Sequence, residues 1–485
     1  MNPTTILLLI AGYFGLLLLV SFLTGKNDSN DTFFKANKQS PWYVVAFGMI
    51  GASLSGVTFI SIPGIVGGEQ FAYMQGVFGF FIGYLFIAFV LLPLYYRLNV
   101  TSIYQYLEQR FGKVSYKTGA FFFILSRVTG ASFRLFLVAL AMQYIVFEQL
   151  GVPFWATVVI SILLIWIYTF RGGIKTIVWT DTLQTLAMLT AVGVAIYLIN
   201  QKLNWSYLEF LSSEDLATKG RIFFFDDPNS KTYFWKYFIG GIFIAIAMTG
   251  LDQDMMQKNL TCKNKNDAQK NMITMATLLV IVNFVFLSLG ALLFIYVDKF
   301  GLQIPIVDGR TRTDLLFPEI AVNQGLGTSL TITFIIGLIA AAYSSADSAL
   351  TSLTTSFSVD FLNIEKRPLN EQKPLRKKVH IGISILLIFV VILFNNLDGN
   401  VVGNLFTFAT FTYGPLLGLF AFGILTKHKI KDRYAWIVAI SSIIFSFIIT
   451  SLPESIIGNY QFQWEILPIN GLITFIGLWL IRKKE

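Results

Sequence analysis

Charged residues are scarce in this chain. Of its 485 residues only 13% are Asp, Glu, Lys or Arg, whereas 55% are hydrophobic. A soluble protein of this length needs about twice as much charge to cover its surface. Apolar runs of roughly 20 residues, the length that crosses a bilayer core as a helix, recur from end to end. The composition predicts an all-α polytopic membrane protein.

Cysteine and histidine are nearly absent as well. The single cysteine, Cys262, excludes a disulfide within the chain. The only histidines, His380 and His428, stand near charged segments, which argues against histidine catalysis and a His-rich metal site. The chain contains no GxxxxGK[ST] phosphate loop, and no segment between apolar runs is long enough for a nucleotide-binding domain. These absences argue against an enzyme and against a pump driven by ATP within this chain.

The apolar runs predict about 13 spans. They lie near residues 4–24, 41–66, 71–96, 118–147, 152–170, 177–200, 235–256, 271–297, 329–358, 379–396, 401–425, 434–452 and 466–481. Of the 36 Lys and Arg residues, 26 fall in segments on one side of these spans and 8 on the other, while Arg127 and Arg134 lie inside a span. This positive-inside pattern predicts a plasma (inner) membrane protein with its N-terminus outside and its C-terminus in the cytoplasm. The net charge of +9 therefore orients the chain and does not indicate nucleic-acid binding.

The first span, 4–24, lacks the basic leader and the small-residue cleavage site of a signal peptide. We expect it to be retained as a helix. No linker divides the rest, so residues 1–485 are expected to form a single transmembrane domain.

Two predicted spans are rich in small residues. The stretch AFGMIGASLSGVTFISIPG (46–64) contains four glycines, three serines and a proline, and IGGIFIAIAMTGLDQD (239–254) is the other. Broken backbone at membrane depth is tolerated only where it is buried in protein or lines a cavity. The two spans are five apart, which fits a LeuT-type 5+5 inverted repeat whose halves each begin with a discontinuous helix. Close helix packing is the alternative reason for the small residues.

The stretch AAYSSADSALTS (341–352) combines a carboxylate with five aliphatic hydroxyls at the end of an apolar run. On a helix one stripe, bordered by Asp347, contains Ala341, Ser344, Ser345, Ser348 and Ser352. A carboxylate at membrane depth costs about 2.5–3.5 kcal/mol, so it normally faces a partner or a wet cavity. Hydroxyl and carboxylate oxygens suit a hard cation. The serines could instead bond to their own helix while Asp347 acts as a cap, but the combination favours a cation site.

A second carboxylate, Asp181, lies just inside the inner end of its span in RGGIKTIVWTDTLQTLAML (171–189). After Thr180 it could simply cap a helix. Alternatively it supplies the negative charge for a second cation.

Three stretches carry a resemblance to a known family. GGIKTIVWTDTLQ resembles the equivalent segment of sodium:solute symporters, AAYSSADSALTS running on to FSVDFL is similar to their sodium-binding eighth core helix, and GASLSGVTFISIPG to their broken first core helix. The layout of the spans fits too, so the resemblance covers essentially the whole chain. It implies an extra N-terminal helix at 4–24, an inverted-repeat core over about 41–425 and two extra C-terminal helices within 434–481.

The resemblance also implies one or two Na⁺ sites. The main site would use the carbonyls of Gly51, Leu54 and Ala341 with the hydroxyls of Ser344 and Ser345. A second site, present in some members, would use Asp181, Ser344 and Ser348. Where those members have a further serine this chain has Asp347, which could strengthen the site, admit a proton or change the stoichiometry.

Sialic-acid members bind substrate through a serine and a threonine on the first core helix, Phe-x-x-x-Gln on the second and an arginine on the third. The resemblance carries these roles over to Ser55, Thr58, Phe71 and Gln75, with either Arg127 or Arg134 as the anchor for a carboxylate. A guanidinium matches a carboxylate in two parallel bonds. An ion pair or snorkelling is the alternative role of the arginines. Sugar-transporting members have an Asn and a Tyr that AIAMTG (245–250) lacks.

The sequence therefore predicts a Na⁺-coupled symporter that imports a small carboxylate-bearing solute such as sialic acid by alternating access, with a sugar or polyol as the alternative substrate. Three other functions have requirements of their own. A channel would need a continuous polar pore, and an intramembrane enzyme would need a nucleophile with a base. A sensor would be expected to carry an added signalling domain beyond Glu485. The expected partners are the substrate, sodium ions and membrane lipids, without nucleic acid or an obligate protein partner.

Overall fold

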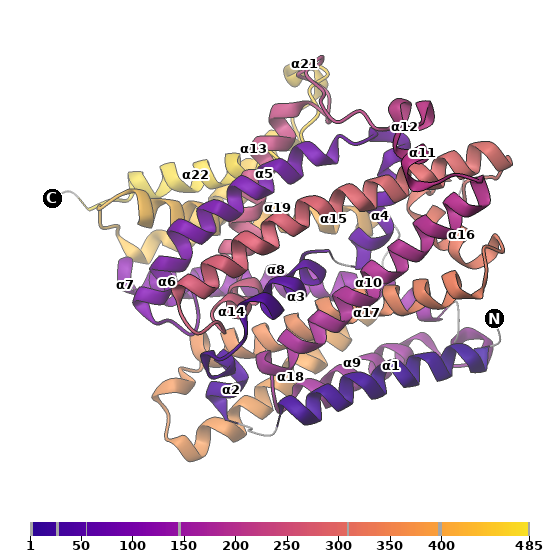
Figure 1. Cartoon of the computed structure of the whole chain (residues 1–485). Helices are drawn as coiled ribbons and strands as arrows, with labels where there is room; N and C mark the ends of the chain where they lie inside the picture. Colours follow the sequence, from indigo (N-terminus) through magenta and orange to yellow (C-terminus); the bar gives the residue numbers. More distant parts are fainter. Residues whose placement is uncertain are drawn as a thin grey trace.

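The computed structural model describes residues 3–25, 29–54, 56–143, 147–307, 310–395 and 400–483, and these residues are mostly helical (Figure 1). The longer helices are α1 (Pro3–Thr24), α3 (Trp42–Ser53), α4 (Gly56–Glu69), α5 (Tyr73–Phe86), α8 (Lys113–Met142), α9 (Phe154–Thr169), α10 (Ile174–Leu203), α13 (Phe234–Ala245), α15 (Lys265–Phe300), α17 (Thr328–Ser356), α18 (Leu369–Asn395), α19 (Asn400–Leu425), α20 (Ala435–Thr450) and α22 (Ile466–Leu480).

Short elements connect them. The short helices are α2 (Asn30–Lys35), α6 (Leu92–Leu98), α7 (Gln105–Arg110), α11 (Tyr207–Leu211), α12 (Glu214–Lys219), α14 (Gln253–Asn259), α16 (Leu316–Asn323) and α21 (Glu454–Ile457). Strands β1 (Ile306–Val307) and β2 (Arg310–Thr311) form a small antiparallel ladder. Helices α5, α13 and α17 each continue into a π-helical segment, at Ile87–Leu91, Ile246–Gly250 and Phe357–Phe361 respectively.

The predicted helical membrane architecture is confirmed. Among the described residues, 8 helices are long and apolar enough to cross a membrane, 2 bent helix pairs each resemble a broken span, and shorter apolar helices include Phe154–Thr169 and Ile466–Leu480. Each predicted span overlaps one of these helices or pairs, and the span at 401–425 overlaps the short apolar helix Thr410–Leu425. The number of crossings and their direction stay predictions.

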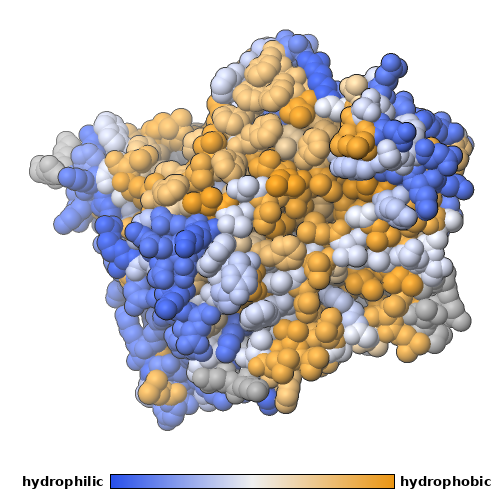
Figure 2. Space-filling model, in the orientation of Figure 1, coloured by the Kyte–Doolittle hydropathy of each residue, from blue (hydrophilic) through white to orange (hydrophobic). Residues whose placement is uncertain are grey.

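Burial separates inner helices from outer ones. We compare the most apolar 18-residue stretch of each helix. In α15 72% of these residues are buried and in α17 76% are buried, whereas in the stretches that contain α1 and α20 only 22% are buried. Helix α10 packs against both α3 and α17, and α13 packs against α5. The space-filling view shows apolar side chains across the middle of the molecule and polar ones gathered toward its two ends (Figure 2). The outer helices therefore present apolar surface where a membrane protein needs it.

Both predicted interruptions are present. Helices α3 and α4 meet at 57°, and the segment Phe234–Gly250 meets α14 at 71°. At the first break Leu54 leaves the helical region, with φ −87° and ψ 78°. At the second, Asp252 is extended and caps α14, because its Oδ1 accepts hydrogen bonds from the backbone N–H groups of Asp254 and Met255 at 2.9 and 3.1 Å.

Tyrosines satisfy the backbone that the second break frees. The hydroxyl of Tyr95 donates to the carbonyl oxygen of Gly250, and that of Tyr104 to the carbonyl oxygen of Leu251, both at 2.9 Å. All four residues are buried. These bonds allow a non-helical turn to persist inside the bundle.

The structure places His380 on the same helix as the charged segment that precedes it. Helix α18 begins at Leu369 rather than near residue 379, so the charged segment forms its first turns and His380 lies deeper in the bundle. Its side chain is 2% exposed, and its Nδ1 lies 2.9 Å from the hydroxyl of Thr354.

Candidate substrate cavity and cation site

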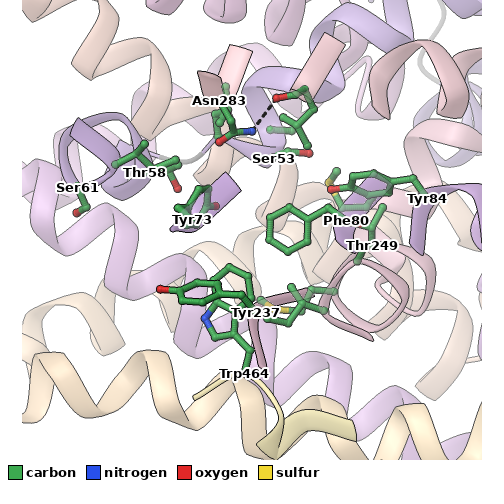
Figure 3. A pocket seen from close by; sticks show the side chains of 18 of the residues that line it. Ser53, Thr58, Ser61, Tyr73, Phe80, Tyr84, Tyr237, Thr249, Asn283 and Trp464 are labelled. Atoms are coloured by element: carbon green, nitrogen blue, oxygen red, sulfur yellow. Dashed lines mark hydrogen bonds between the residues drawn. The ribbon is translucent and has the colours of Figure 1, made fainter. Parts of the chain in front are cut away.

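A cavity of about 430 Å³ lies where the two broken helices meet (Figure 3). This volume is in the range of small-molecule sites. The lining comes from both sides of each break and from the neighbouring helices, and includes Ser53, Leu54, Thr58, Ser61, Glu69, Tyr73, Phe80, Tyr84, Arg127, Arg134, Tyr237, Met248, Thr249, Met255, Asn283, Thr410, Gln463 and Trp464. The cavity therefore offers hydroxyls, two amides, a carboxyl group, two guanidinium groups and an aromatic wall.

The predicted substrate residues divide into two groups. Thr58, Arg127 and Arg134 line the cavity. Phe71 and Gln75 do not, although both are buried. Ser55 lies outside the described residues.

Gln75 is held by the backbone around it. Its Nε2 donates to the carbonyl oxygens of Ala72 and Thr232, at 3.1 and 2.9 Å, and its Oε1 accepts from the N–H of Phe224 at 3.0 Å. The amide thus fastens the loop between α12 and α13 to the start of α5, which leaves no group free to read a substrate.

The two arginines of α8 have different partners. The Nη1 of Arg127 lies 3.8 Å from Oδ2 of Asp252, and its Nη2 pairs with Oδ2 of Asp254. Asp252 also accepts a hydrogen bond from the hydroxyl of Tyr413. Arg134 is half-buried and forms no ion pair with any residue that the structure describes. The ion-pair interpretation therefore holds for Arg127, whereas Arg134 lines the cavity without an ion pair to any described residue.

The residues of the expected main Na⁺ site come from two packed elements. Gly51 and Leu54 stand at the end of α3, while Ala341, Ser344 and Ser345 lie on α17, which packs against α3. All five residues are buried. Among the described residues, the Oγ of Ser345 has a single, long contact of 3.4 Å to the carbonyl oxygen of Ala341. Carbonyl and hydroxyl oxygens are the ligands a hard cation requires, so the donor set fits Na⁺.

Close approach at Gly51 explains why glycine stands there. A Cβ at this position would lie 2.3 Å from Oγ1 of Thr185 on α10. That hydroxyl is 3.1 Å from the N–H of Gly51. The end of α3 can therefore lie directly on α10, which carries Asp181.

Asp181 is not a helix cap, because it lies within α10, which begins at Ile174. Its Oδ1 accepts a hydrogen bond from the Oγ of Ser344 at 2.7 Å, and its Oδ2 lies 2.7 Å from Nζ of Lys258 on α14. Both members of this ion pair are 1% exposed. The ammonium group thus occupies one of the two oxygens that a second cation would need.

Asp347 lies on α17 beside this pair and interacts electrostatically with Asp181 and Lys258. Its Oδ2 accepts a hydrogen bond from the hydroxyl of Tyr168 at 2.7 Å. Its Oδ1 and the Oγ of Ser348 have no hydrogen-bond partner among the described residues, and both side chains are buried. Two buried carboxyl groups, those of Asp181 and Asp347, thus lie beside a single ammonium group, which pairs with Asp181.

Sequence reasoning missed Lys258, Asp254 and Trp464. Lys258 follows the predicted span at 235–256 and counts there among the basic residues between spans, but α14 carries it into the bundle. The signal was present, since LDQDMMQK places Asp252, Asp254 and Lys258 directly after the predicted break. Trp464 had no comparable signal in the sequence.

A helical membrane bundle in which two broken helices meet at a cavity defines the class of LeuT-type secondary transporters. A family model of the sodium:solute symporter family matches residues 33–433. The chain belongs to this family.

The chain is also similar to individual sodium-coupled transporters. The chain is 27% identical over 372 residues to the sodium/sialic acid symporter NanT of Aliivibrio fischeri, covering 74% of this chain and 70% of the relative. It is 26% identical over 441 residues to the sodium/sialic acid symporter SiaT of Proteus mirabilis (86% and 84%) and 24% identical to the human sodium/iodide cotransporter (85% and 65%).

Solved structures share the fold. The outward-open, substrate-bound structure of a Na⁺-coupled sialic acid symporter has a TM-score of 0.83 at 22% identity and covers 99% of both chains. Mhp1, a nucleobase-cation-symport-1 family transporter, has a TM-score of 0.60 at 14% identity, covering 93% of this chain and 94% of that one. The predicted LeuT-type fold and the predicted family are thereby confirmed.

Proposed function

We propose that this protein is a Na⁺-coupled symporter that imports a small carboxylate-bearing solute, with sialic acid the leading substrate. It moves the solute without transforming it, from an outer face that holds the N-terminus to the cytoplasm that holds the C-terminus. The observation that carries the proposal is Arg134, a guanidinium without an ion-pair partner among the described residues, which lines the cavity between two broken helices.

Arg134 is suited to anchor the carboxylate. A charge at this depth is costly unless it has a partner or water, and a carboxylate supplies two oxygens in the geometry of the guanidinium fork. Thr58 and Asn283 line the same cavity and offer polar groups for the rest of the solute. The naming of NanT and SiaT as sialic acid symporters supports the acid over a neutral sugar.

The driving ion binds between α3 and α17. Gly51, Leu54 and Ala341 provide carbonyls, and Ser344 and Ser345 provide hydroxyls. Sodium joins the two elements there, and since the same break of α3 lines the substrate cavity, sodium and substrate are linked by one reciprocal coupling free energy.

A second cation, Na⁺ or H⁺, binds at Asp347 and Ser348 rather than at Asp181. The ammonium of Lys258 already compensates Asp181. Asp347 is buried, and an ionised carboxylate there is strongly unfavourable unless a cation or a proton neutralises it. Ser348 presents an oxygen without a hydrogen-bond partner among the described residues beside it.

The test is uptake into proteoliposomes under an inward Na⁺ gradient. We expect N-acetylneuraminate to accumulate, and glucose and myo-inositol not to. Replacement of Na⁺ by choline or K⁺ is expected to abolish uptake. Accumulation of a neutral sugar alone would establish the runner-up substrate class, and uptake at equal rates without Na⁺ would refute the symport mechanism.

A further inference from the structure

One wall of the cavity is built by a segment outside the inverted-repeat core. Gln463 and Trp464 line the cavity, yet they belong to the segment between α21 and α22. The family model ends at residue 433, and the expected core ends near residue 425. The proposed substrate therefore has a contact surface that the core helices do not supply.

Two glycines form the slot that admits Trp464. A Cβ on Gly76 of α5 would lie 2.2 Å from the indole atom Cζ3, and a Cβ on Gly240 of α13 would lie 2.4 Å from Cβ of Trp464. Any larger residue at either position would displace the indole. The two core helices are thus shaped to receive a side chain from outside the core.

Aromatic rings of the core fix the indole in place. The ring of Phe80 stacks on it with centroids 5.5 Å apart and an angle of 14°, while Tyr73 and Tyr237 meet it edge-on at 5.7 and 4.6 Å. The hydroxyl of Tyr237 donates to Oε2 of Glu69 at 2.6 Å. These contacts make Trp464 part of a rigid aromatic wall rather than a loosely placed loop residue.

The backbone on both sides of Trp464 is also held in place. Nζ of Lys236 donates to the carbonyl oxygen of Gln461 at 3.0 Å and lies 3.6 Å from the ring centroid of Tyr460. The hydroxyl of Tyr460 donates to Glu465 at 3.0 Å. The backbone around Trp464 is therefore fixed to α13, the helix that contains the second break.

The wall faces the polar part of the cavity. Figure 3 shows Trp464 and Tyr237 on the side opposite Asn283 and Thr58. We propose that Trp464 is a substrate-contacting, specificity-determining residue that packs against the C–H face of a ring-shaped carboxylate-bearing solute. This inference rests on the proposed function, since it assumes that the carboxylate is held by Arg134. The indole of Trp464 favours apolar contact with the C–H groups of the solute ring. The contact between the carboxylate and Arg134 fixes only the acid end of the solute.

The test compares wild type with Trp464→Ala and Trp464→Phe in Na⁺-coupled uptake of N-acetylneuraminate. We expect Trp464→Ala to raise KM about tenfold, as for loss of an aromatic contact together with its buried area, and to lower kcat far less. Trp464→Phe, which keeps an aromatic face, is expected to recover most of the affinity. The control is Trp479→Ala, on the exposed surface of α22, with wild-type KM.

A structural role would give a different pattern. Thermal unfolding of each purified variant, with and without Na⁺, detects a structural role. We expect Na⁺ to shift the unfolding temperature equally in wild type and in both Trp464 variants. Wild-type transport with an unchanged KM in Trp464→Ala would overturn this inference alone, as would an equal loss of folding stability in both variants without a change in KM. Transport of non-cyclic acids alone would also overturn only this inference, whereas failure of wild type to transport any carboxylate-bearing solute would refute the proposed function as well.

Discussion

Arg127 and Arg134 stand seven residues apart on α8 and line the same cavity, yet their surroundings differ. Arg127 is matched by Asp252 and Asp254 at the break before α14, whereas Arg134 has no ion-pair partner in the described part of the chain. A buried charge with partners holds a structure together, and removal of one partner is costly because the other is left uncompensated. A charge without one is available to a ligand. Because the residue type is the same, we propose the two different roles from the position of the opposite charges alone.

The largest expected effect comes from Arg127→Gln. Loss of this guanidinium leaves two buried carboxylates uncompensated, so the free energy of unfolding is expected to fall by about 3–5 kcal/mol. Thermal unfolding of the purified protein in detergent measures this. Arg134→Gln serves as the matched control, with unfolding close to wild type. Equal stability of both variants would remove the distinction between the two arginines.

The next effect concerns the buried cluster of Lys258, Asp181 and Asp347. Lys258→Met leaves Asp181 without its ammonium, so we expect a destabilised protein that added Na⁺ restores, with a lower half-saturating Na⁺ concentration for uptake. Asp347→Asn removes the second carboxyl group and should lower the Na⁺ Hill coefficient toward one. Sodium titrations of uptake and of thermal unfolding give both results. Unchanged sodium dependence in both variants would mean that this cluster binds no Na⁺.

Arg134→Lys is expected to act on transport instead of stability. Lys keeps the charge but cannot form two parallel bonds with a carboxylate, and hydrogen bonds to charged groups contribute about 1.5–3 kcal/mol. We therefore expect kcat/KM for N-acetylneuraminate to fall about 10- to 100-fold. Thermal unfolding should stay near that of wild type. Full transport activity in this variant would transfer the anchor role to another residue of the cavity.

The sequence predicts much of this fold, for identifiable reasons. Apolar runs report burial and membrane exposure directly, and the small residues at 46–64 and 239–254 mark the two breaks because they loosen a helix. The prediction that Asp181 meets the hydroxyls of 341–352 also agrees with the Ser344–Asp181 hydrogen bond. These features are local, or follow from the family resemblance.

The sequence alone could not predict contacts between distant segments. Lys258 looked like a loop cation because it follows a break, and only the 71° turn into α14 shows that it points back to Asp181. Gln75 matched a substrate motif, but the bonds that hold it come from Phe224 and Thr232, far along the chain. Which polar group is left for a ligand depends on which ones the rest of the chain already satisfies.

The smallest expected effect tests the same principle on α17. Ser345 and Ser352 share one stripe of this helix and both are buried, but only Ser345 belongs to the proposed Na⁺ site. The Oγ of Ser352 donates to the carbonyl oxygen of Ala349 at 3.1 Å, whereas the single contact of Ser345 among the described residues is the long one of 3.4 Å. Ser345→Ala removes one oxygen from a cation that keeps its other ligands, so about 1 kcal/mol is expected to be lost.

The half-saturating Na⁺ concentration for uptake should accordingly rise about fivefold in Ser345→Ala. Ser352→Ala should leave it unchanged, because its hydroxyl serves its own helix. KM for the substrate at saturating Na⁺ should stay near wild type in both variants, which separates sodium binding from substrate binding. Equal sodium dependence of the two variants would show that the stripe does not distinguish ligands from helix-bonded serines, and the Na⁺ site would then have to lie elsewhere.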